Sequence, residues 1–283
     1  MAVSSTKDIN LRIKSIKNTK QITKAMELVA ASKLTKAKER IEKCQHFYNA
    51  VYDAMSDIAQ RNLDSSSEYL EQREVKKTCY VVIAGDRGLA GGYNSNIFRL
   101  AKEQLEGKKP CILPVGRRSL EYFKRAGYDV MTEEFSKVEE INIGDCYEMS
   151  NFLTDSYLNK EFDELYIIYT HFVSVLSQQP MVKKLLPIDK SIGEPKSESK
   201  GYIMIEPSVA TVFQEIVPSF IAGMLWGAVC ESTTSEFGAR RTAMESATKN
   251  AEEMIDKLSL EYNRARQGSI TQEITEIVAG SGL

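Results

Sequence analysis

The sequence predicts an α/β domain of Rossmann-like type, joined to a long antiparallel coiled coil that the N- and C-terminal helices form. Three observations lead to this fold class. Residues 1–62 contain neither proline nor glycine and carry a heptad pattern. Residues 75–207 alternate short apolar runs with amphipathic stretches. Residues 208–283 are again helical in pattern and contain no proline after Pro218. We therefore expect three segments with these boundaries.

The N-terminal segment is expected to be one long helix with an apolar seam. Apolar or small residues recur at alternating steps of four and three, which is the spacing of a coiled coil. Extending the seam backwards makes it polar in its middle. Because a helix of this length is not held by propensity alone, a partner helix must cover the seam. The seam comprises Ala30, Leu34, Ala37, Ile41, Cys44, Tyr48, Val51, Met55 and Ile58, and its extension comprises Ile9, Ile13, Ile16, Lys20, Thr23 and Glu27.

A polar connector at residues 64–74 is expected to lie on the surface, followed by the α/β domain. Apolar runs at 79–85, 111–116, 164–172 and 201–207 predict strands. Amphipathic stretches predict one helix between the first two runs, at 95–107, and two helices between the second and third runs, at 117–127 and 145–160. This alternation indicates a mainly parallel sheet. The polar stretch 189–201 is expected to be a loop.

The C-terminal segment supplies the partner helix that the first segment needs. Its predicted seam runs through Met244, Ala247, Ala251, Met254 and Leu258, with Glu261 as a break before Ala265. Alanine in a seam allows two helices to approach closely. The alternative is that both ends belong to an ordinary helical bundle, which would not require such long seams.

Composition argues against a metal centre and against a membrane span. The five cysteines are scattered without a CxxC pair, and there are only two histidines. Free thiols in a reducing compartment are the expected state. The longest apolar run, "FIAGMLWGAVC", is too short to cross a bilayer, so no direct membrane insertion is expected. Residues 1–44 hold eleven Lys or Arg against four acids, which favours an acidic partner surface.

The stretch "AGDRGLAGGYNSN" follows the first predicted strand and raises the question of a phosphate site. It fails as a Walker A motif, because no Gly-Lys-Ser/Thr follows its last glycine. It fails as a dinucleotide fingerprint, because its glycines are spaced three and three apart, and Asp86 would place a negative charge beside a phosphate. We interpret it as a tight strand-to-helix crossover in which Arg87 suits a docking surface. The chain shows no catalytic constellation, and no cofactor is expected.

Three blocks of the sequence carry a family resemblance. "IKNTKQITKAMELVAASKL", "GDRGLAGGYN" and "ATKNAEEMIDKLSLEYNRARQGSITQEITEIVAG" closely resemble the gamma subunits of F-type ATP synthases, in the order and at the spacing of that family. The resemblance covers essentially the whole chain and points to a bacterial form. The last residues, Ser281, Gly282 and Leu283, depart conservatively from the usual ending.

The resemblance implies a non-catalytic rotor shaft. The coiled coil would sit inside a hexamer of three alpha and three beta subunits, and the α/β domain would stand with the epsilon subunit on the membrane c-ring. The complex would lie peripherally on the cytoplasmic face of the cell membrane. The implied partner contacts are Lys20, Lys24, Met26, Arg87, Ala90, Arg266, Gln267 and Thr271.

Two other functions stay open from the residues alone. A phosphorylated ligand could bind the middle domain of an enzyme whose helices merely dimerise, which the glycine spacing disfavours. A basic coiled coil could bind nucleic acid, but that would need a free basic helix rather than one paired along its seam, so no nucleic-acid partner is expected.

Overall fold

The computed structural model describes residues 6–60, 67–189, 206 and 208–281. They form two compact units, one comprising Met1–Ala31 and Arg240–Leu283 and the other Ser32–Ala239. We call these the coiled-coil unit and the α/β unit. The two long helices, α1 (Thr6–Gln60) and α5 (Val209–Ser281), contribute to both. The compact units thus divide the chain differently from the three expected segments, although each helix and strand falls within its segment.

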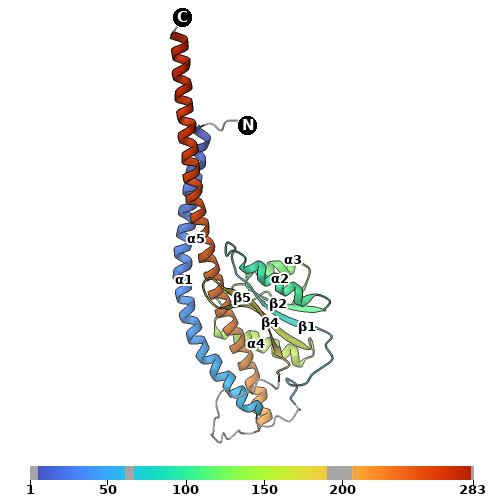
Figure 1. Ribbon diagram of the computed structural model, residues 1–283. Helices are drawn as coiled ribbons and strands as arrows, with labels where there is room; N and C mark the ends of the chain where they lie inside the picture. Colours follow the sequence, from blue (N-terminus) through green and yellow to red (C-terminus); the bar gives the residue numbers. More distant parts are fainter. Residues whose placement is uncertain (1–5, 61–66, 190–205, 207, 282–283) are drawn as a thin grey trace. The chain divides into compact units, whose positions relative to one another are not determined.

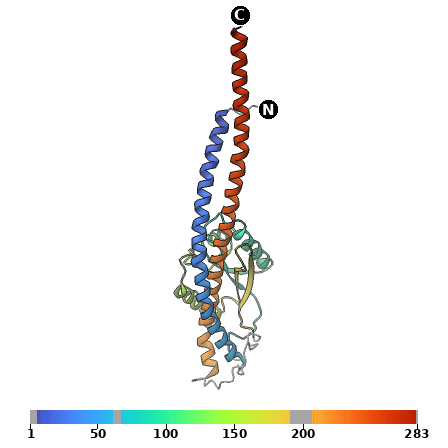
Figure 2. The ribbon, with the colours of Figure 1, turned by 60° about the vertical axis from the view of Figure 1, so that its left-hand side comes forward.

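In the coiled-coil unit, α1 and α5 lie side by side and run antiparallel (Figure 2). Thr23 pairs with Thr248 through their hydroxyl oxygens at 2.8 Å. Three residues earlier on α1, the ammonium of Lys20 lies 2.8 Å from the carboxylate of Glu252, four residues later on α5. Ile9, Ile13 and Ala30 are buried. The backward extension of the α1 seam and its polar middle are therefore confirmed.

The α5 seam in this unit runs in a different register from the expected one. Met254, an expected seam residue, is 51% exposed. Thr248 is buried instead of Ala247, and Ile255 is half-buried. Tyr262 then continues the seam, so Glu261 does not break it. The resulting row keeps strict steps of four and three: Met244, Thr248, Ala251, Ile255, Leu258, Tyr262 and Ala265. Near-equal small residues at 247 and 248 made both registers compatible with the pattern.

The α/β unit contains a five-stranded sheet of order β3-β2-β1-β4-β5 (Figure 1). Strands β1 (Thr78–Ile83), β2 (Pro110–Val115), β3 (Asp129–Val130) and β4 (Glu164–Phe172) are parallel. The edge strand β5 (Gln178–Leu186) pairs antiparallel with β4. The helices are α2 (Tyr93–Leu105), α3 (Arg117–Arg125) and α4 (Ile143–Leu158). The expected mainly parallel, Rossmann-like sheet is confirmed.

Three of the four expected strands and all three expected helices are present in the α/β unit. The runs at 79–85, 111–116 and 164–172 correspond to β1, β2 and β4. Most of the fourth run, 201–207, and most of the expected loop at 189–201 lie outside the described residues. The sequence pattern missed β5, because its exposed residues include lysines and glutamines that weaken the apolar signal.

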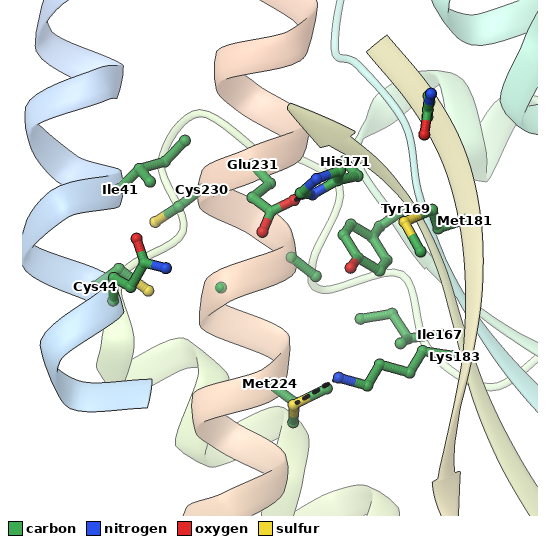
Figure 3. A pocket seen from close by; sticks show the side chains of 14 residues that line it. Ile41, Cys44, Ile167, Tyr169, His171, Met181, Lys183, Met224, Cys230 and Glu231 are labelled. Carbon is green, nitrogen blue, oxygen red and sulfur yellow. Dashed lines mark hydrogen bonds and ion pairs between the residues drawn. The ribbon is translucent and has the colours of Figure 1, made fainter. Parts of the chain in front are cut away.

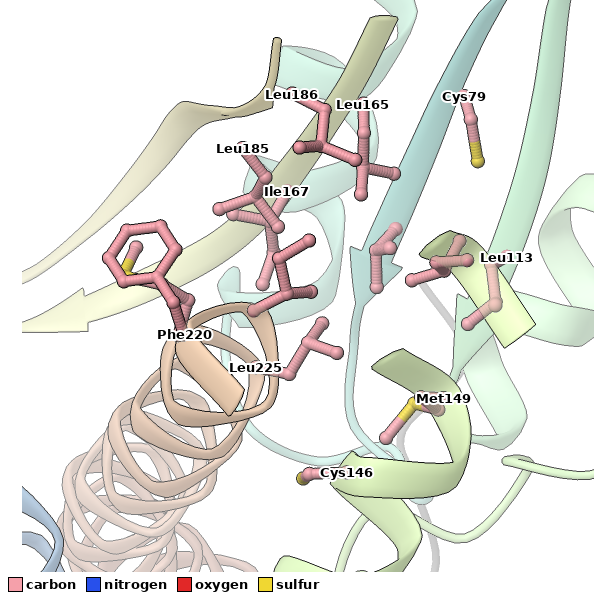
Figure 4. Close-up of a cluster of buried hydrophobic side chains, with 14 of the residues drawn as sticks. Cys79, Leu113, Cys146, Met149, Leu165, Ile167, Leu185, Leu186, Phe220 and Leu225 are labelled. Carbon is pink, nitrogen blue, oxygen red and sulfur yellow. The ribbon is translucent and has the colours of Figure 1, made fainter. Parts of the chain in front are cut away.

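Two apolar cores cover the two faces of the sheet. On one face, α2 and α3 pack through Ile97, Ala101 and Phe123 onto Tyr80 and Val82 of β1. On the other face lie α4 and the first part of α5, whose side chains Met149, Phe220 and Leu225 belong to the same cluster as Ile167 (Figure 4). Alternate residues of β1 serve the two cores, as the period of a strand requires. The sheet is therefore buried on both sides, which is usual for parallel sheets.

The expected surface connector is partly buried. Tyr69 and Leu70 belong to the same core as α4, and the Tyr69 ring stacks on that of Tyr157 with 6.1 Å between centroids. Arg73 lies over the Tyr157 ring at 4.6 Å. The expectation was wrong here because a Ser- and Glu-rich stretch hides two consecutive core residues.

One helix, α5, is long and apolar enough to pass a length-and-composition test for a membrane span, with a mean hydropathy of 1.4 over its best window. In this chain 56% of that window is buried. Phe213, Val217 and Ile221 of α5 pack into the core of the α/β unit. The domain core thus accounts for the apolar character of this part of the helix.

Candidate functional site

The glycine-rich loop links the end of β1 to the start of α2. Its two arms are joined by Asn94, whose side-chain oxygen accepts a hydrogen bond from the backbone N–H of Gly85 at 2.9 Å. The Asn94 amide nitrogen also donates to the carbonyl of Arg87 at 3.3 Å. A Cβ atom at Gly85 would lie 2.6 Å from a carboxylate oxygen of Glu236 on α5, so a side chain here would displace that carboxylate. The loop is a tight crossover, as expected.

The carboxylate of Asp86 occupies the position that an anion would take at the edge of the sheet. One oxygen accepts from the backbone N–H of Arg117, at the first turn of α3, at 3.1 Å and from that of Val138 at 2.9 Å. The other accepts from the backbone N–H of Glu139 at 3.2 Å. Backbone N–H groups at a helix start are the usual cradle for phosphate. Here the chain fills that cradle with its own carboxylate, which argues against a nucleotide at this loop.

Replacing Asp86 with alanine is expected to lower the free energy of unfolding by about 2 kcal/mol, because three backbone donors lose a charged acceptor. The check is urea unfolding of the full chain, monitored by circular dichroism. Glu134→Ala removes an exposed carboxylate nearby and serves as the control, with an expected change within about 0.5 kcal/mol. Equal stabilities for the two variants would show that Asp86 is not structural.

The two loop residues that the resemblance implied as contacts differ in their exposure. Arg87 is exposed. Ala90 is only 3% exposed, whereas its neighbour Leu89 is 63% exposed at a positive φ of 63°. The apolar surface that the loop presents therefore belongs to Leu89, a residue that was not among the implied contacts.

The implied contact residues of α1 lie in the coiled-coil unit. Lys20 pairs with Glu252, and its ammonium lowers the pKa of that carboxyl by hydrogen bonding and charge. Lys24 is exposed and pairs with Glu27 at 3.0 Å. Met26 is half-buried and lies between exposed Ile22 and Val29 at helical spacing. Residues four and three apart share one helix face, so these three form an apolar stripe on the outer surface of α1.

The implied contact residues of α5 lie near the C-terminal end of the same unit. Arg266, Gln267 and Thr271 are all exposed, and the Thr271 hydroxyl donates to the Gln267 carbonyl at 2.9 Å. Every described residue from Arg266 to Gly280 is exposed. This tip is a single helix that extends beyond the start of α1 within the unit (Figure 2). It includes exposed isoleucines on one face, namely Ile270, Ile274 and Ile277.

The described residues contain no cluster of three or more His, Cys, Asp or Glu side chains that could hold a metal ion. His171 pairs with Glu231 at 2.5 Å, which joins β4 to α5. Trp226 packs under the guanidinium of Arg40, 4.1 Å from the ring centroid. Both residues thus make structural contacts between elements.

Comparison with known proteins settles the family. A family model described as ATP synthase matches residues 5–282. The ATP synthase gamma chain of Desulforamulus reducens is 43% identical over 280 residues, covering 99% of each chain. The chain belongs to the ATP synthase gamma-chain family. The ATP synthase gamma chain of Alkaliphilus metalliredigens is 44% identical, covering 97% of this chain and 96% of that one.

The fold agrees with a solved relative. A chain in the cryo-EM structure of the Euglena gracilis mitochondrial ATP synthase, OSCP/F1/c-ring, aligns with a TM-score of 0.67 at 18% identity. The alignment covers 98% of this chain and 93% of that chain. As a gamma chain, the protein is a non-catalytic subunit of an ATP synthase and a peripheral part of a membrane-associated complex.

Proposed function

We propose that the chain is the central rotor shaft of an F-type ATP synthase, which couples ion flow through a membrane c-ring to ATP synthesis or hydrolysis by rotation. Three alpha and three beta subunits surround the coiled-coil unit and carry the catalytic sites. The α/β unit stands on the c-ring together with the epsilon subunit. The complex lies on the cytoplasmic face of a bacterial cell membrane.

One observation carries this proposal, the bare tip of α5. A single helix is only marginally stable in water, and isoleucines at helical spacing on an exposed face normally pack against another protein surface. No other element of the described chain covers this face between Arg266 and Gly280. Partner subunits that surround the tip supply that cover. Their apolar contacts hold the tip on the rotation axis without specific ion pairs.

The remainder of the coiled-coil unit suits a shaft that turns. Its seam is polar at Lys20 and Thr23, where ion pairing and hydroxyl pairing replace apolar packing. Polar groups in a seam fix the register of two helices at some cost in stability. A fixed register prevents one helix from sliding along the other when torque is applied. The outer stripe of Ile22, Met26 and Val29 then faces the beta subunits.

The direct test of this assignment is co-purification. A tagged chain expressed in its own cells should bring down alpha and beta subunits in equal amounts, each at about three copies per tagged chain, as symmetric assembly around one shaft requires. Recovery of the chain alone, or with a partner set that lacks both subunits, would contradict the proposal.

Replacing Met26 with lysine tests the stripe on α1. The new ammonium can form an ion pair with an acidic segment of a beta subunit in one rest position. This added binding energy makes rotation from that position less tightly coupled to ATP hydrolysis. We expect near-normal assembly and ATP hydrolysis, with roughly twofold fewer ions pumped per ATP, a size that one added surface charge pair can produce. The measurement is ATP-driven ion uptake per ATP hydrolysed in inverted vesicles.

Met26→Leu is the matched control, because it keeps the apolar bulk and adds no charge. Its pumping ratio should equal that of the unmodified complex. If Met26→Lys also pumps normally, Met26 is an ordinary packing residue and the stripe does not contact the beta subunits.

A further inference from the structure

Two of the five cysteines face each other from different helices of the α/β unit. All five are free thiols and all are buried. Cys44 on α1 and Cys230 on α5 line the same cavity of about 500 Å³, which is bounded on its other side by β4 and β5. In Figure 3 the Cys230 side chain extends from α5 toward α1, where Cys44 is located. The cavity therefore brings together two thiols that are far apart in the sequence.

The surroundings of the pair favour ionisation of Cys44. The thiol of Cys230 hydrogen-bonds to the Cys44 sulfur and lowers the pKa of Cys44, and the positive charge of Arg40 lowers it further. Burial and the charge of Glu231 act in the opposite direction. The contact with Cys44 and burial raise the pKa of Cys230. The two thiols thus lie beside each other and near the positive charge of Arg40, which favours a thiolate at this place.

Access to the pair differs from access to the other thiols. Cys44 keeps 5% of its surface exposed and opens onto the cavity with Cys230. Cys146, on α4, does not line this cavity and is fully buried. Burial raises the pKa of Cys146 to about 12. A small oxidant that enters the cavity therefore meets Cys44 and Cys230 rather than Cys146.

We propose that Cys44 and Cys230 form a reversible disulfide when the chain meets a peroxide. The Cys44 thiolate attacks one peroxide oxygen, the O–O bond breaks, and the leaving oxide takes a proton to become water or an alcohol. Cys44 is then a sulfenic acid. The Cys230 sulfur attacks the Cys44 sulfur, the S–O bond breaks, and the Cys230 proton leaves with the hydroxide as water. Two electrons pass from the thiols to the peroxide, and a dithiol returns them by exchange.

The bond would connect α1 to α5 inside the α/β unit. At this level the helices otherwise meet through noncovalent contacts, such as those of Arg40 with Trp226 on α5. Oxidation would therefore add a covalent link between the first and last helices of the chain. This inference does not depend on the rotor function, since it concerns only the chain's own thiols.

The test uses the full chain in its purified complex. Hydrogen peroxide is added, remaining thiols are blocked with iodoacetamide, and the chain is digested with trypsin without reductant. We expect a species that joins peptide 44–61 to peptide 201–240 and is about 2 Da lighter than their sum, because two hydrogens are lost. Dithiothreitol should remove it. When the chain is denatured and then alkylated, the fraction of Cys44 that reacts with iodoacetamide should be about tenfold lower after peroxide than before it. The reacting fraction of Cys146 should be unchanged.

Cys146→Ser is the matched control and should keep the linked species, whereas Cys44→Ser should lose it. The proposal is overturned if Cys44 remains fully alkylated after peroxide, if it stops at sulfinic acid, or if it links to Cys146. The unmodified chain alone decides among these outcomes, so the result does not depend on whether a variant folds.

Discussion

Replacing Gly116 with alanine is expected to lower the free energy of unfolding by about 3 kcal/mol or more, through backbone strain and a steric clash. Gly116 precedes α3 with a φ of 91°, in a region that side chains rarely adopt. A Cβ atom here would collide with the carbonyl oxygen of Ala84, at the end of β1. Neither backbone can move easily, because Ala84 donates to Val115 and Gly116 donates to Phe135, both at 2.9 Å. Chemical denaturation of the full chain measures the effect.

Gly127→Ala separates the two contributions. Gly127 has a comparable φ of 76°, but nothing lies within 4 Å of a Cβ atom there. It should cost only about 1 kcal/mol, the strain of a left-handed conformation without a clash. If both variants lose the same stability, the contact with Ala84 is not what requires glycine at position 116.

Replacing Arg266 and Gln267 together with alanine is expected to lower the ATPase activity of the assembled complex by about tenfold, the size of a lost interface hot spot. Both side chains are exposed on the bare tip of α5, so the chain itself should fold normally. Arginine and amide groups supply directional hydrogen bonds in a stretch where exposed isoleucines otherwise dominate. The measurement is ATP hydrolysis by the purified complex, with the circular dichroism of the chain recorded alongside.

Asp256→Ala combined with Lys257→Ala is the control for this pair. These residues are also exposed and polar, and they lie on the part of α5 that pairs with α1. Their replacement should leave ATP hydrolysis within about twofold of normal, as surface changes away from a contact usually do. Equal activities for the two double variants would assign Arg266 and Gln267 to a solvated helix face.

Much of the fold could be predicted because its signals are local. The α1 seam needs only apolar residues at steps of four and three, and Leu34, Ala37 and Met55 are buried as that spacing requires. The runs that became β1 and β2 are apolar and buried almost throughout, since a parallel sheet is covered on both faces, and the run of β4 has an apolar centre. Such patterns are complete within a few residues of sequence.

The rest depended on contacts that local patterns do not contain. Strand β5 is an edge strand with Lys183 and Lys184 in its middle, so its apolar alternation is incomplete. The register of α5 was decided by the hydroxyl of Thr248 meeting that of Thr23 on another helix. Tyr69 and Leu70 are buried in a core to which residues of α4 and of other elements far away in the sequence contribute.

The candidate site divides in the same way. The glycine spacing was enough to argue against a phosphate site, and the negative charge of Asp86 argued against it as well. Its three backbone donors could not be predicted, because Val138 and Glu139 come from a loop about fifty residues away. The contact residues came from family resemblance. Exposed Ile22 and Val29 could have been found from their spacing around Met26, because all three apolar residues lie off the assigned seam.

Observation of rotation tests the central claim most directly. All five native cysteines are buried, so a single exposed cysteine introduced on α2 as Lys102→Cys can carry a bead. With the beta subunits fixed to a surface and ATP supplied, the bead should turn in one direction through full circles and stop when ATP is removed. A bead that stays still while the same complex hydrolyses ATP would contradict the account of this chain as the rotor.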